Sequence, residues 1–232
     1  MNLFIEAIQW ILDPANWSGA GGIGARVVEH LLFSGAVLLA AAVLGIPAGT
    51  LIGHTGRGRG LVVAITGGAR ALPTLGLLTI FGLWLGIGVD APFLALLVLA
   101  LPPVLAGSYA GIESVDRATI GAARAIGFTE RQILTRVELP LAAPVILGGL
   151  RSAALQVIST ATLAAYVADV GLGRPLFLGL RTQDYPMMLG ASILVALLAL
   201  VVELLFQVVQ SAAVRRAEPH RARPRAHERI QA

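Results

Sequence analysis

The stretch "GAARAIGFTERQILTRVELP", residues 121–140, combines clustered charges with a helical pattern that a glycine interrupts. Apolar stretches long enough to cross a bilayer lie on both sides of it. A plain connector between two membrane spans needs only about four residues. The stretch therefore predicts a structured loop that is shaped to fit a partner.

Helix signals divide this loop into two short helices. Asp116 is placed to cap a helix that begins at Arg117, because its carboxylate can accept hydrogen bonds from unpaired amides. Gly127 suits the end of that helix, since glycine adopts a positive φ at little cost. Thr129 and Gln132 have the spacing of a capping box, which would start the second helix. We therefore expect a helix–turn–helix elbow lying parallel to the membrane.

The two predicted helices differ in their side chains. Small residues share one face of the first helix: Ala118, Ala122 and Ala125. An apolar stripe follows the second helix: Ile133, Leu134 and Val137. Pro140 is expected to end the second helix or redirect the chain, because proline lacks an N–H and clashes with the preceding turn.

The composition of the whole chain indicates a membrane protein. Of the 232 residues, 56% are hydrophobic and only 13% are charged, whereas soluble domains have about 25% charged residues. There is no cysteine, which excludes disulfides and thiolate metal sites, and the four histidines form no ligand pair at helical spacing. All seventeen basic residues are arginine. Without lysine the chain has no phosphate-binding loop, so if ATP drives its activity, another polypeptide must hydrolyse it.

Apolar runs predict an all-α, polytopic transmembrane domain over residues 25–214. A helix needs about 20 residues to cross roughly 30 Å of hydrocarbon. Five spans are expected, at residues 31–53, 61–89, 91–112, 139–168 and 186–214. The charged loop between the third and fourth spans, residues 113–138, contains the elbow.

The two ends of the chain differ from this domain. Within residues 1–24, Leu3–Leu12 is apolar on one side but too short to cross a bilayer, and Trp10 and Trp17 are nearby. We expect a short helix in the membrane interface there. The tail, residues 215–232, is basic and broken by prolines, which favours a disordered anchor, with binding to anionic lipid as the alternative. Nothing else in the chain supports nucleic acid binding.

Arginine distribution predicts the orientation. One set of loops and the tail hold two, four and six arginines, twelve altogether, whereas the other set holds three, counting Arg26 at the mouth of the first span. Because cytoplasmic loops are enriched in arginine, the N-terminus should lie outside the membrane and the C-terminus inside. The elbow is then cytoplasmic.

Glycines at four-residue spacing occur in two of the expected spans. They are Gly45, Gly49 and Gly53 in the first and Gly107 and Gly111 in the third. Small residues at this spacing allow close approach of membrane helices, so they support an oligomer.

Six side chains in or beside the spans are candidates for a solute path. They are Arg70, Trp84, Tyr109, Arg151, Tyr166 and Glu203. An arginine inside a membrane costs about 2.5–3.5 kcal/mol, so the two arginines either line a cavity, pair with Glu203, or extend to the headgroups. The aromatic rings suit stacking on a quaternary ammonium group, and interface anchoring or packing is the alternative for each.

The spacing A-A-x-x-x-G, nine residues, then aliphatic-x-L-P resembles the signature loop of type I ABC importer permeases. Its residues here are Ala122, Ala123, Gly127, Val137, Leu139 and Pro140. The family pattern usually begins with glutamate, where this chain has Gly121, and usually has isoleucine where Val137 stands. The resemblance implies that the elbow sits in a groove of an ATPase subunit, which binds ATP and Mg. The residues assigned to this coupling are Ala122, Ala123, Gly127, Thr129, Glu130, Arg131, Leu139 and Pro140.

Two further stretches, "RALPTLGLL" and "ISTATLAAYVADVGLGRPLFLGL", are similar to permeases for glycine betaine, choline, carnitine and related osmoprotectants. The resemblance implies a multi-pass protein of the bacterial inner membrane, without catalytic or metal-binding residues. Its partners would be ABC ATPase subunits, an extracytoplasmic solute-binding protein and a second permease copy or paralogue. The stretch 169–185 would carry a gate helix facing the binding protein, or else form a solvated loop.

Three other functions remain open at this point. The first is the same machine carrying an amino acid such as methionine. The second is an ion-coupled secondary transporter, which should show titratable pairs or inverted repeats near the midplane, whereas this chain has isolated charges. The third is a membrane-embedded enzyme, for which the spans offer no cluster of histidine, cysteine or acidic residues.

Overall fold

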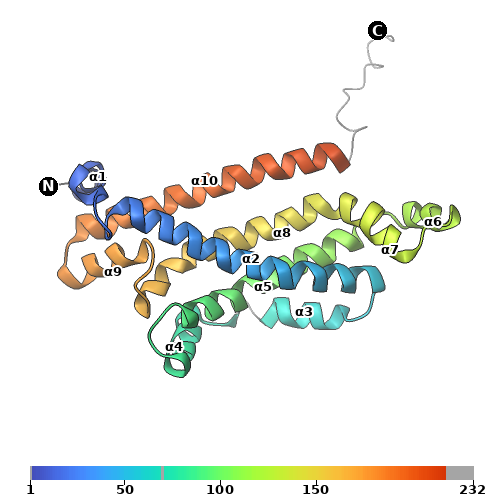
Figure 1. Cartoon of the computed structure of the whole chain (residues 1–232), viewed down its shortest axis with the longest axis horizontal. Helices are drawn as coiled ribbons and strands as arrows, with labels where there is room; N and C mark the ends of the chain where they lie inside the picture. Colours follow the sequence, from blue (N-terminus) through green and yellow to red (C-terminus); the bar gives the residue numbers. More distant parts are fainter. Residues whose placement is uncertain (1, 69–70, 218–232) are drawn as a thin grey trace, which may run out of the picture.

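A computed structural model describes residues 2–68 and 71–217, and every regular element in that part of the chain is a helix. Four long helices form an elongated bundle (Figure 1). They are α2 (Ile23–Thr55), α5 (Asp90–Glu113), α8 (Leu139–Thr160) and α10 (Tyr185–Ala217). Within the described residues, these helices, with α8 extended to Glu130–Tyr166, are the ones long and apolar enough to cross a membrane.

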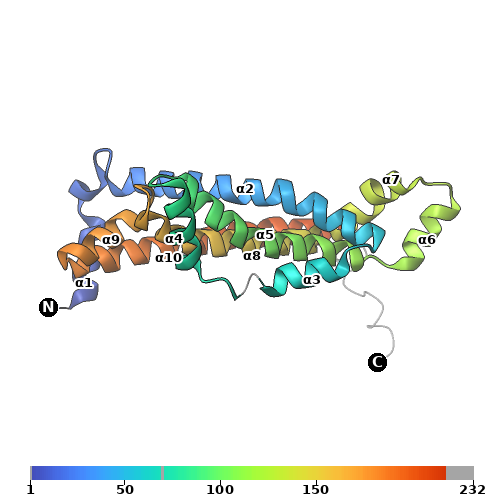
Figure 2. The same cartoon turned by 90° about the horizontal axis from the view of Figure 1, so that it is seen from below.

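Shorter helices lie along the bundle and at its two ends (Figures 1 and 2). They are α1 (Leu3–Leu12), a 3₁₀ turn (Pro14–Trp17), α3 (Arg59–Gly68), α4 (Thr74–Leu85), α6 (Arg117–Ala125), α7 (Glu130–Ile133), a π-helical turn (Leu134–Glu138), a 3₁₀ turn (Ala161–Tyr166) and α9 (Gly173–Thr182). The elbow, α6 and α7, is at one end of the bundle, and α1 and α9 are at the other.

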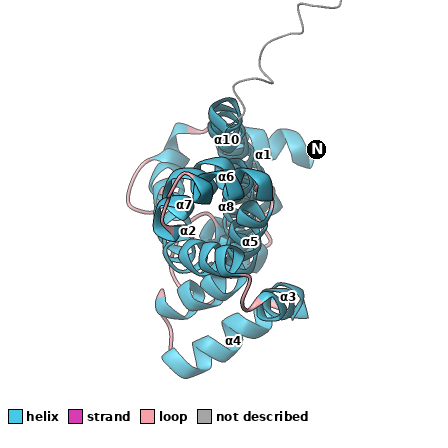
Figure 3. Cartoon of the chain, turned by 90° about the vertical axis from the view of Figure 1, so that its right-hand side faces the viewer, coloured by secondary structure: helices cyan, strands magenta, loops and turns pink. Residues whose placement is uncertain are grey.

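Four of the five expected spans are confirmed as long helices, and the second is interrupted. Residues 61–89 form α3 and α4, which have 10 and 12 residues, so neither alone is long enough to cross a bilayer. α3 is described up to Gly67 and Gly68, which favour helix weakly, and α4 begins after Pro73, its N-cap. Figure 3 shows α4 projecting away from the bundle.

Small residues let α2, α5 and α8 pack closely. A Cβ atom added to Gly49 would lie 2.6 Å from the carbonyl oxygen of Leu105, and one added to Gly107 would lie 2.6 Å from the Cα of Gly149. The glycine pairs that the sequence offered for an oligomer are therefore used inside the chain, joining α2 to α5 and α5 to α8. They therefore no longer support an oligomer.

The predicted N-terminal helix is confirmed with the same bounds, but it is not free of the bundle. Trp10 packs on α10, where a Cβ atom added to Gly190 would lie 2.5 Å from the indole Cε3. The indole nitrogen of Trp17 donates to the carbonyl oxygen of Ile11 at 2.6 Å and closes the turn behind α1. Most of the basic tail, residues 218–232, lies outside the described residues, as does Arg70.

Candidate functional site

The first half of the elbow forms as the sequence predicts. The Asp116 carboxylate accepts from the backbone N–H of Ala118 at 3.1 Å and caps α6. After α6 ends, Gly127 has a φ of 91°, in the left-handed region that favours glycine. The bend between the two helices therefore depends on this residue, and a Cβ atom there would meet nothing within 4 Å.

The second half begins with the predicted capping box. The backbone N–H of Gln132 donates to the Thr129 hydroxyl at 3.3 Å, and the backbone N–H of Thr129 donates to the Gln132 side-chain oxygen at 2.9 Å. Pro140 was expected to end the second helix or to redirect the chain. It does not end the helix. The backbone N–H of Leu139 reaches back to the carbonyl oxygen of Leu134, so a π-helical turn takes the chain directly into α8.

The elbow has a buried face and an exposed face. Ile120, Ala123 and Ile133 are buried, and they form a cluster with residues of α5 and α8. Ala123 therefore packs inside the elbow, where it is 7% exposed, and its assignment to the coupling stays a prediction. The small face is open to solvent, and its members are Ala118, Gly121, Ala122 and Ala125. Next to them Ile126 is 75% exposed.

Charged groups beside this face are tied to one another. The Arg124 guanidinium donates to both carboxylate oxygens of Glu130, at 2.8 and 3.0 Å. These hydrogen bonds stabilise the charged carboxylate and hold the pKa of Glu130 below its usual range. Because both side chains are more than half exposed, the pair fixes geometry more than it stabilises the fold. Thr129, Arg131 and Pro140 are also exposed, whereas Leu139 is half-buried.

A second polar cluster joins α8 to α10 at the middle of the bundle. The Arg151 guanidinium donates to the Glu203 carboxylate with Nε at 2.7 Å, and its Nη1 reaches the side-chain oxygen of Gln210 at 3.3 Å. Gln210 in turn donates to the carbonyl oxygen of Pro144 at 3.0 Å. Of the alternatives expected for Arg151, the structure shows the pairing with Glu203. Each charge therefore has a partner.

We expect Glu203→Leu to reduce the amount of folded protein in the membrane. The change leaves the Arg151 guanidinium without its carboxylate partner inside a bilayer, where a charged arginine costs about 2.5–3.5 kcal/mol. The double change Arg151→Met with Glu203→Leu should restore folding, because it removes both charges. The measurement is the monodisperse yield of the detergent-extracted chain. A double variant that is no better folded than Glu203→Leu would show that the pairing is unimportant.

The three candidate aromatic residues do not come together. Trp84 in α4 is 74% exposed and lies 6.4 Å from Phe81, measured between ring centroids. Tyr166 is 62% exposed and lies 6.3 Å from Phe177. Tyr109 lies in the last turns of α5, with its backbone beside Gly53 of α2, whereas α4 with Trp84 precedes the first turn of α5. The three rings therefore form no single cage for a quaternary ammonium group.

Sequence reasoning missed a polar stripe on α8. Ser152, Gln156 and Ser159 are exposed on one face of this apolar helix, and their spacing of four and three residues was the available signal. Ser152 and Gln156 line a cavity of about 160 Å³ between α3, α5 and α8, together with Thr66, Leu99, Pro102, Pro103 and Ala106. Exposed polar groups are costly against lipid, so this face suits water or solute.

Comparison with known proteins shows the family. Residues 41–218 match the family described as "Binding-protein-dependent transport system inner membrane component". The chain belongs to this family, the permease subunits of ABC importers, and is a multi-pass protein of the bacterial inner membrane. This agrees with the resemblance of the elbow motif.

Curated relatives cover most of the chain. The choline transport system permease protein OpuBB of Bacillus subtilis is 30% identical over 185 residues, which are 80% of this chain and 85% of that protein. The carnitine transport permease protein OpuCB of Listeria monocytogenes is 33% identical over 75% of this chain and 80% of its own length. The osmoprotectant import permease protein OsmW of Salmonella typhimurium is 30% identical over 89% and 96%.

A solved structure shares the fold. The MetNI methionine ABC transporter in an inward-facing conformation matches with a TM-score of 0.71, at 21% sequence identity, over 82% of this chain and 95% of that chain. At this identity the likeness concerns the fold alone.

Proposed function

We propose that this chain forms the translocation pore of an ATP-driven importer for a small osmoprotectant such as glycine betaine, choline or carnitine. The observation that carries the class is the elbow, because its capped helices, its left-handed glycine and its open small face are more than a connector needs. The named relatives support the cargo, since all three transport choline, carnitine or another osmoprotectant.

In this proposal the elbow docks on an ABC ATPase subunit, which binds ATP and Mg and hydrolyses the ATP. The small face of α6 would let the partner approach closely, and Ile126 would enter an apolar pocket on it. The Arg124–Glu130 pair would keep α6 and α7 at a fixed angle while they are pushed. The permease chain itself performs no covalent chemistry.

The arrangement in the membrane follows from arginine counting. The elbow end of the bundle and the tail, residues 215–232, would be cytoplasmic, and residues 1–24 would be extracytoplasmic. Within the domain at residues 25–214, α3 and α4 would together complete the fifth crossing. Figure 1 supports this, because α3 begins near the elbow end of α2 whereas α4 lies toward the other end of the bundle.

A second permease would complete the solute path. The polar stripe Ser152–Gln156–Ser159 would face this path, because it gives neutral hydrogen-bonding groups along a membrane helix. The second permease is a copy or a paralogue; Bacillus subtilis has two choline transport permease proteins, OpuBB and OpuBD, which are 30% and 35% identical to this chain. A solute-binding protein would dock on the extracytoplasmic side, at α9 and the loop before it.

Methionine is the alternative cargo. It rests on fold likeness at 21% identity, whereas relatives at 30–35% identity are named for choline, carnitine and glycine betaine. No observation favours an ion-coupled transporter or an enzyme.

Solute uptake tests this proposal. A bacterial strain without its own uptake systems would express the chain together with an ABC ATPase and a solute-binding protein from the same genome. We expect uptake of at least one of betaine, choline and carnitine, and none of methionine, and we expect it to require the ATPase. Methionine uptake alone would favour the alternative cargo, and uptake without the ATPase would contradict the class.

A further inference from the structure

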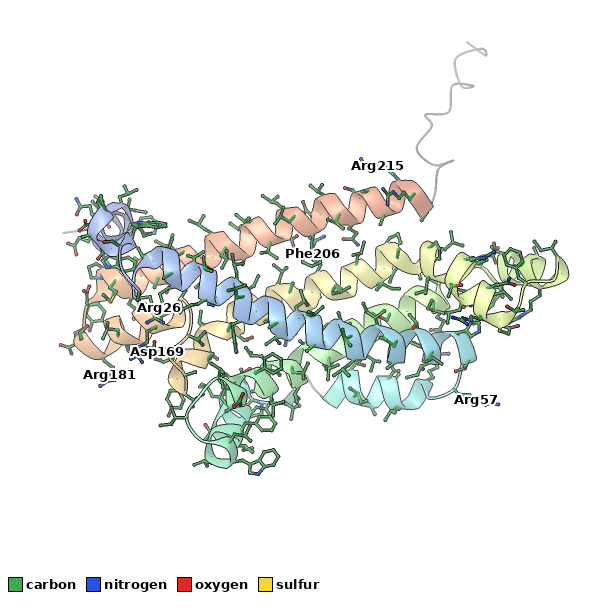
Figure 4. All side chains as sticks on the ribbon, viewed as in Figure 1. Arg26, Arg57, Asp169, Arg181, Phe206 and Arg215 are labelled. Carbon is green, nitrogen blue, oxygen red and sulfur yellow. The ribbon has the colours of Figure 1, made fainter. Side chains whose placement is uncertain are left out.

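Helix α2 is attached to another part of the chain at each of its ends. It has 33 residues and so spans about 50 Å at 1.5 Å per residue. Figure 1 shows it running from the α1 and α9 end of the bundle to the elbow end. In Figure 4, Arg26 and Asp169 lie together at the first end, and Arg57, just beyond the end of α2, lies at the second.

His54, in the last turn of α2, contacts two carboxylates of the elbow region. Its Nδ1 is hydrogen-bonded to Oε2 of Glu138, and its Nε2 lies 3.4 Å from Oε2 of Glu130. Glu138 is only 2% exposed. A buried carboxylate destabilises a protein unless it is paired, so His54 is the partner that lets Glu138 stay there. We name this contact the inner joint.

The inner joint lies at the π-helical turn that connects α7 to α8. Glu138 is the last residue of the π-helical turn. Such turns are rare in proteins, and where they occur they are often part of a functional site. Through Glu130 the joint continues to Arg124 on α6. A displacement of the elbow would therefore reach α2 through two carboxylates, in addition to the packing of Ile46 in α2 against the buried elbow cluster.

The other end of α2 holds the loop at residues 167–172. The backbone N–H of Leu172 donates to Nδ1 of His30 at 3.3 Å, which leaves Nε2 of that ring to donate to the carbonyl oxygen of Ile158 at 3.0 Å. The backbone N–H of Gly171 donates to the Glu29 carboxylate at 3.1 Å. His30 is 1% exposed, and a Cβ atom added to Gly171 would lie 2.8 Å from its Nδ1. We name this contact the outer joint.

An ion-pair chain reinforces the outer joint. Arg26 pairs with Glu29 at 2.9 Å and with Asp169 at 3.0 Å, and Asp169 pairs with Arg174 in α9 at 3.2 Å. The first turns of α2, the loop 167–172 and the start of α9 are therefore tied together. Movement of α2 along its length would move this loop and the helix that follows it.

We propose that α2 transmits movement between the elbow and the loop 167–172, with His54–Glu138 as the inner joint and His30 as the outer joint. This proposal rests on the proposed function, because it gives the elbow an ATPase to respond to and the loop a binding protein to sense. His54, Glu138 and His30 hold α2 to the elbow and to the loop 167–172, and none of them needs to touch solute or ATP. A solute-loaded binding protein at the loop would then stimulate the ATPase through α2.

The test uses the complete transporter in proteoliposomes, with ATPase, both permeases and binding protein. The measurement is the ratio of ATP hydrolysis with and without solute-loaded binding protein. His54→Phe keeps a ring and removes both nitrogens, and we expect the stimulation ratio to fall about tenfold, equivalent to about 1.4 kcal/mol, with assembly and basal hydrolysis retained. His30→Phe should lower the ratio similarly, although it leaves the elbow untouched.

The double variant His54→Phe with Glu138→Gln guards against misfolding, because it leaves no unpaired buried carboxylate. Its stimulation ratio should be no lower than that of His54→Phe alone, as expected for two residues that act through one contact. Two controls should match the wild type. Thr50→Ala removes a buried hydroxyl that bonds only within α2, and Glu113→Gln breaks the ion pair with Arg59 at the same end of the bundle.

The outcomes separate the two proposals. Normal stimulation in His54→Phe and in the double variant would overturn transmission through α2 and leave the proposed function intact. Lost assembly or lost basal hydrolysis in the double variant would give the inner joint a purely structural role, which also overturns the proposal. A wild-type chain that never captures an ATPase would overturn the proposed function itself.

Discussion

Replacing Gly127 with valine is expected to reduce solute uptake at least about tenfold while the protein remains folded. Gly127 has a φ of 91°, and a β-branched residue held there is strained by roughly 1–3 kcal/mol. A Cβ atom at this position meets nothing within 4 Å in the chain, so the spans should still insert. The added bulk would meet the ATPase instead. The measurements are co-purification of the ATPase and uptake at matched membrane levels.

Two variants serve as controls for this experiment. Arg131→Ala removes an exposed side chain of the same elbow, and Val137→Ile restores the residue usual in the family signature. Both should reduce transport less than Gly127→Val does, because Arg131 is exposed, where substitutions usually cost less than about 0.5 kcal/mol, and the partly buried Val137 gains only one methylene group. If Gly127→Val transports normally, the elbow is an ordinary loop and its assigned role is wrong.

Replacing Gly49 with valine should prevent most of the chain from folding. A Cβ atom there would lie 2.6 Å from the carbonyl oxygen of Leu105 and 2.7 Å from the Cβ of Ser108. Overpacking typically costs 1–3 kcal/mol or more, and here a backbone oxygen blocks the side chain, so α2 and α5 would have to separate. The measurement is the monodisperse fraction of detergent-extracted protein.

Gly35→Val is the matched control, because it makes the same change in the same helix where a Cβ atom meets nothing within 4 Å. It should leave most of the chain folded. Equal yields from the two variants would contradict the close packing of α2 on α5.

Local signals in the sequence predicted local structure well. The caps at Asp116 and Thr129 and the positive φ of Gly127 depend on residues within a few positions of one another, and the structure confirms all three. Hydrophobic length, which is also a local property of the chain, predicted five spans, and four of them correspond to long apolar helices. Pro140 shows the limit of this reasoning, because a π-helical turn reorganises the hydrogen bonds before it and the helix continues.

Contacts between distant residues could not be read from the pattern. Glycine spacing showed that helices approach closely, but not that the partners are α5 and α8 of the same chain. His54 and Glu138 are 84 positions apart; His54 belongs to no recognisable motif, and Glu138 stands at the variable position of the signature, between Val137 and Leu139. Pairing with Glu203 was one of the alternatives that the sequence left open for Arg151, because charges inside the spans are so few, and the structure shows it. Which of Arg70, Trp84, Tyr109 and Tyr166 touches solute stays a prediction.

Cross-linking from the elbow tests the central claim, docking of the ATPase, most directly. The chain contains neither cysteine nor lysine, so a cysteine placed at Ile126 gives a single thiol for a short thiol-to-amine cross-linker, and no lysine of the chain competes with the lysines of a partner. A cysteine at Leu12 is the control, since that side chain is 70% exposed at the opposite end of the bundle. In membranes that contain the whole transporter, a product with the ATPase should form from position 126 and not from position 12. No ATPase product from position 126, in a variant that still transports solute, would contradict docking at the elbow.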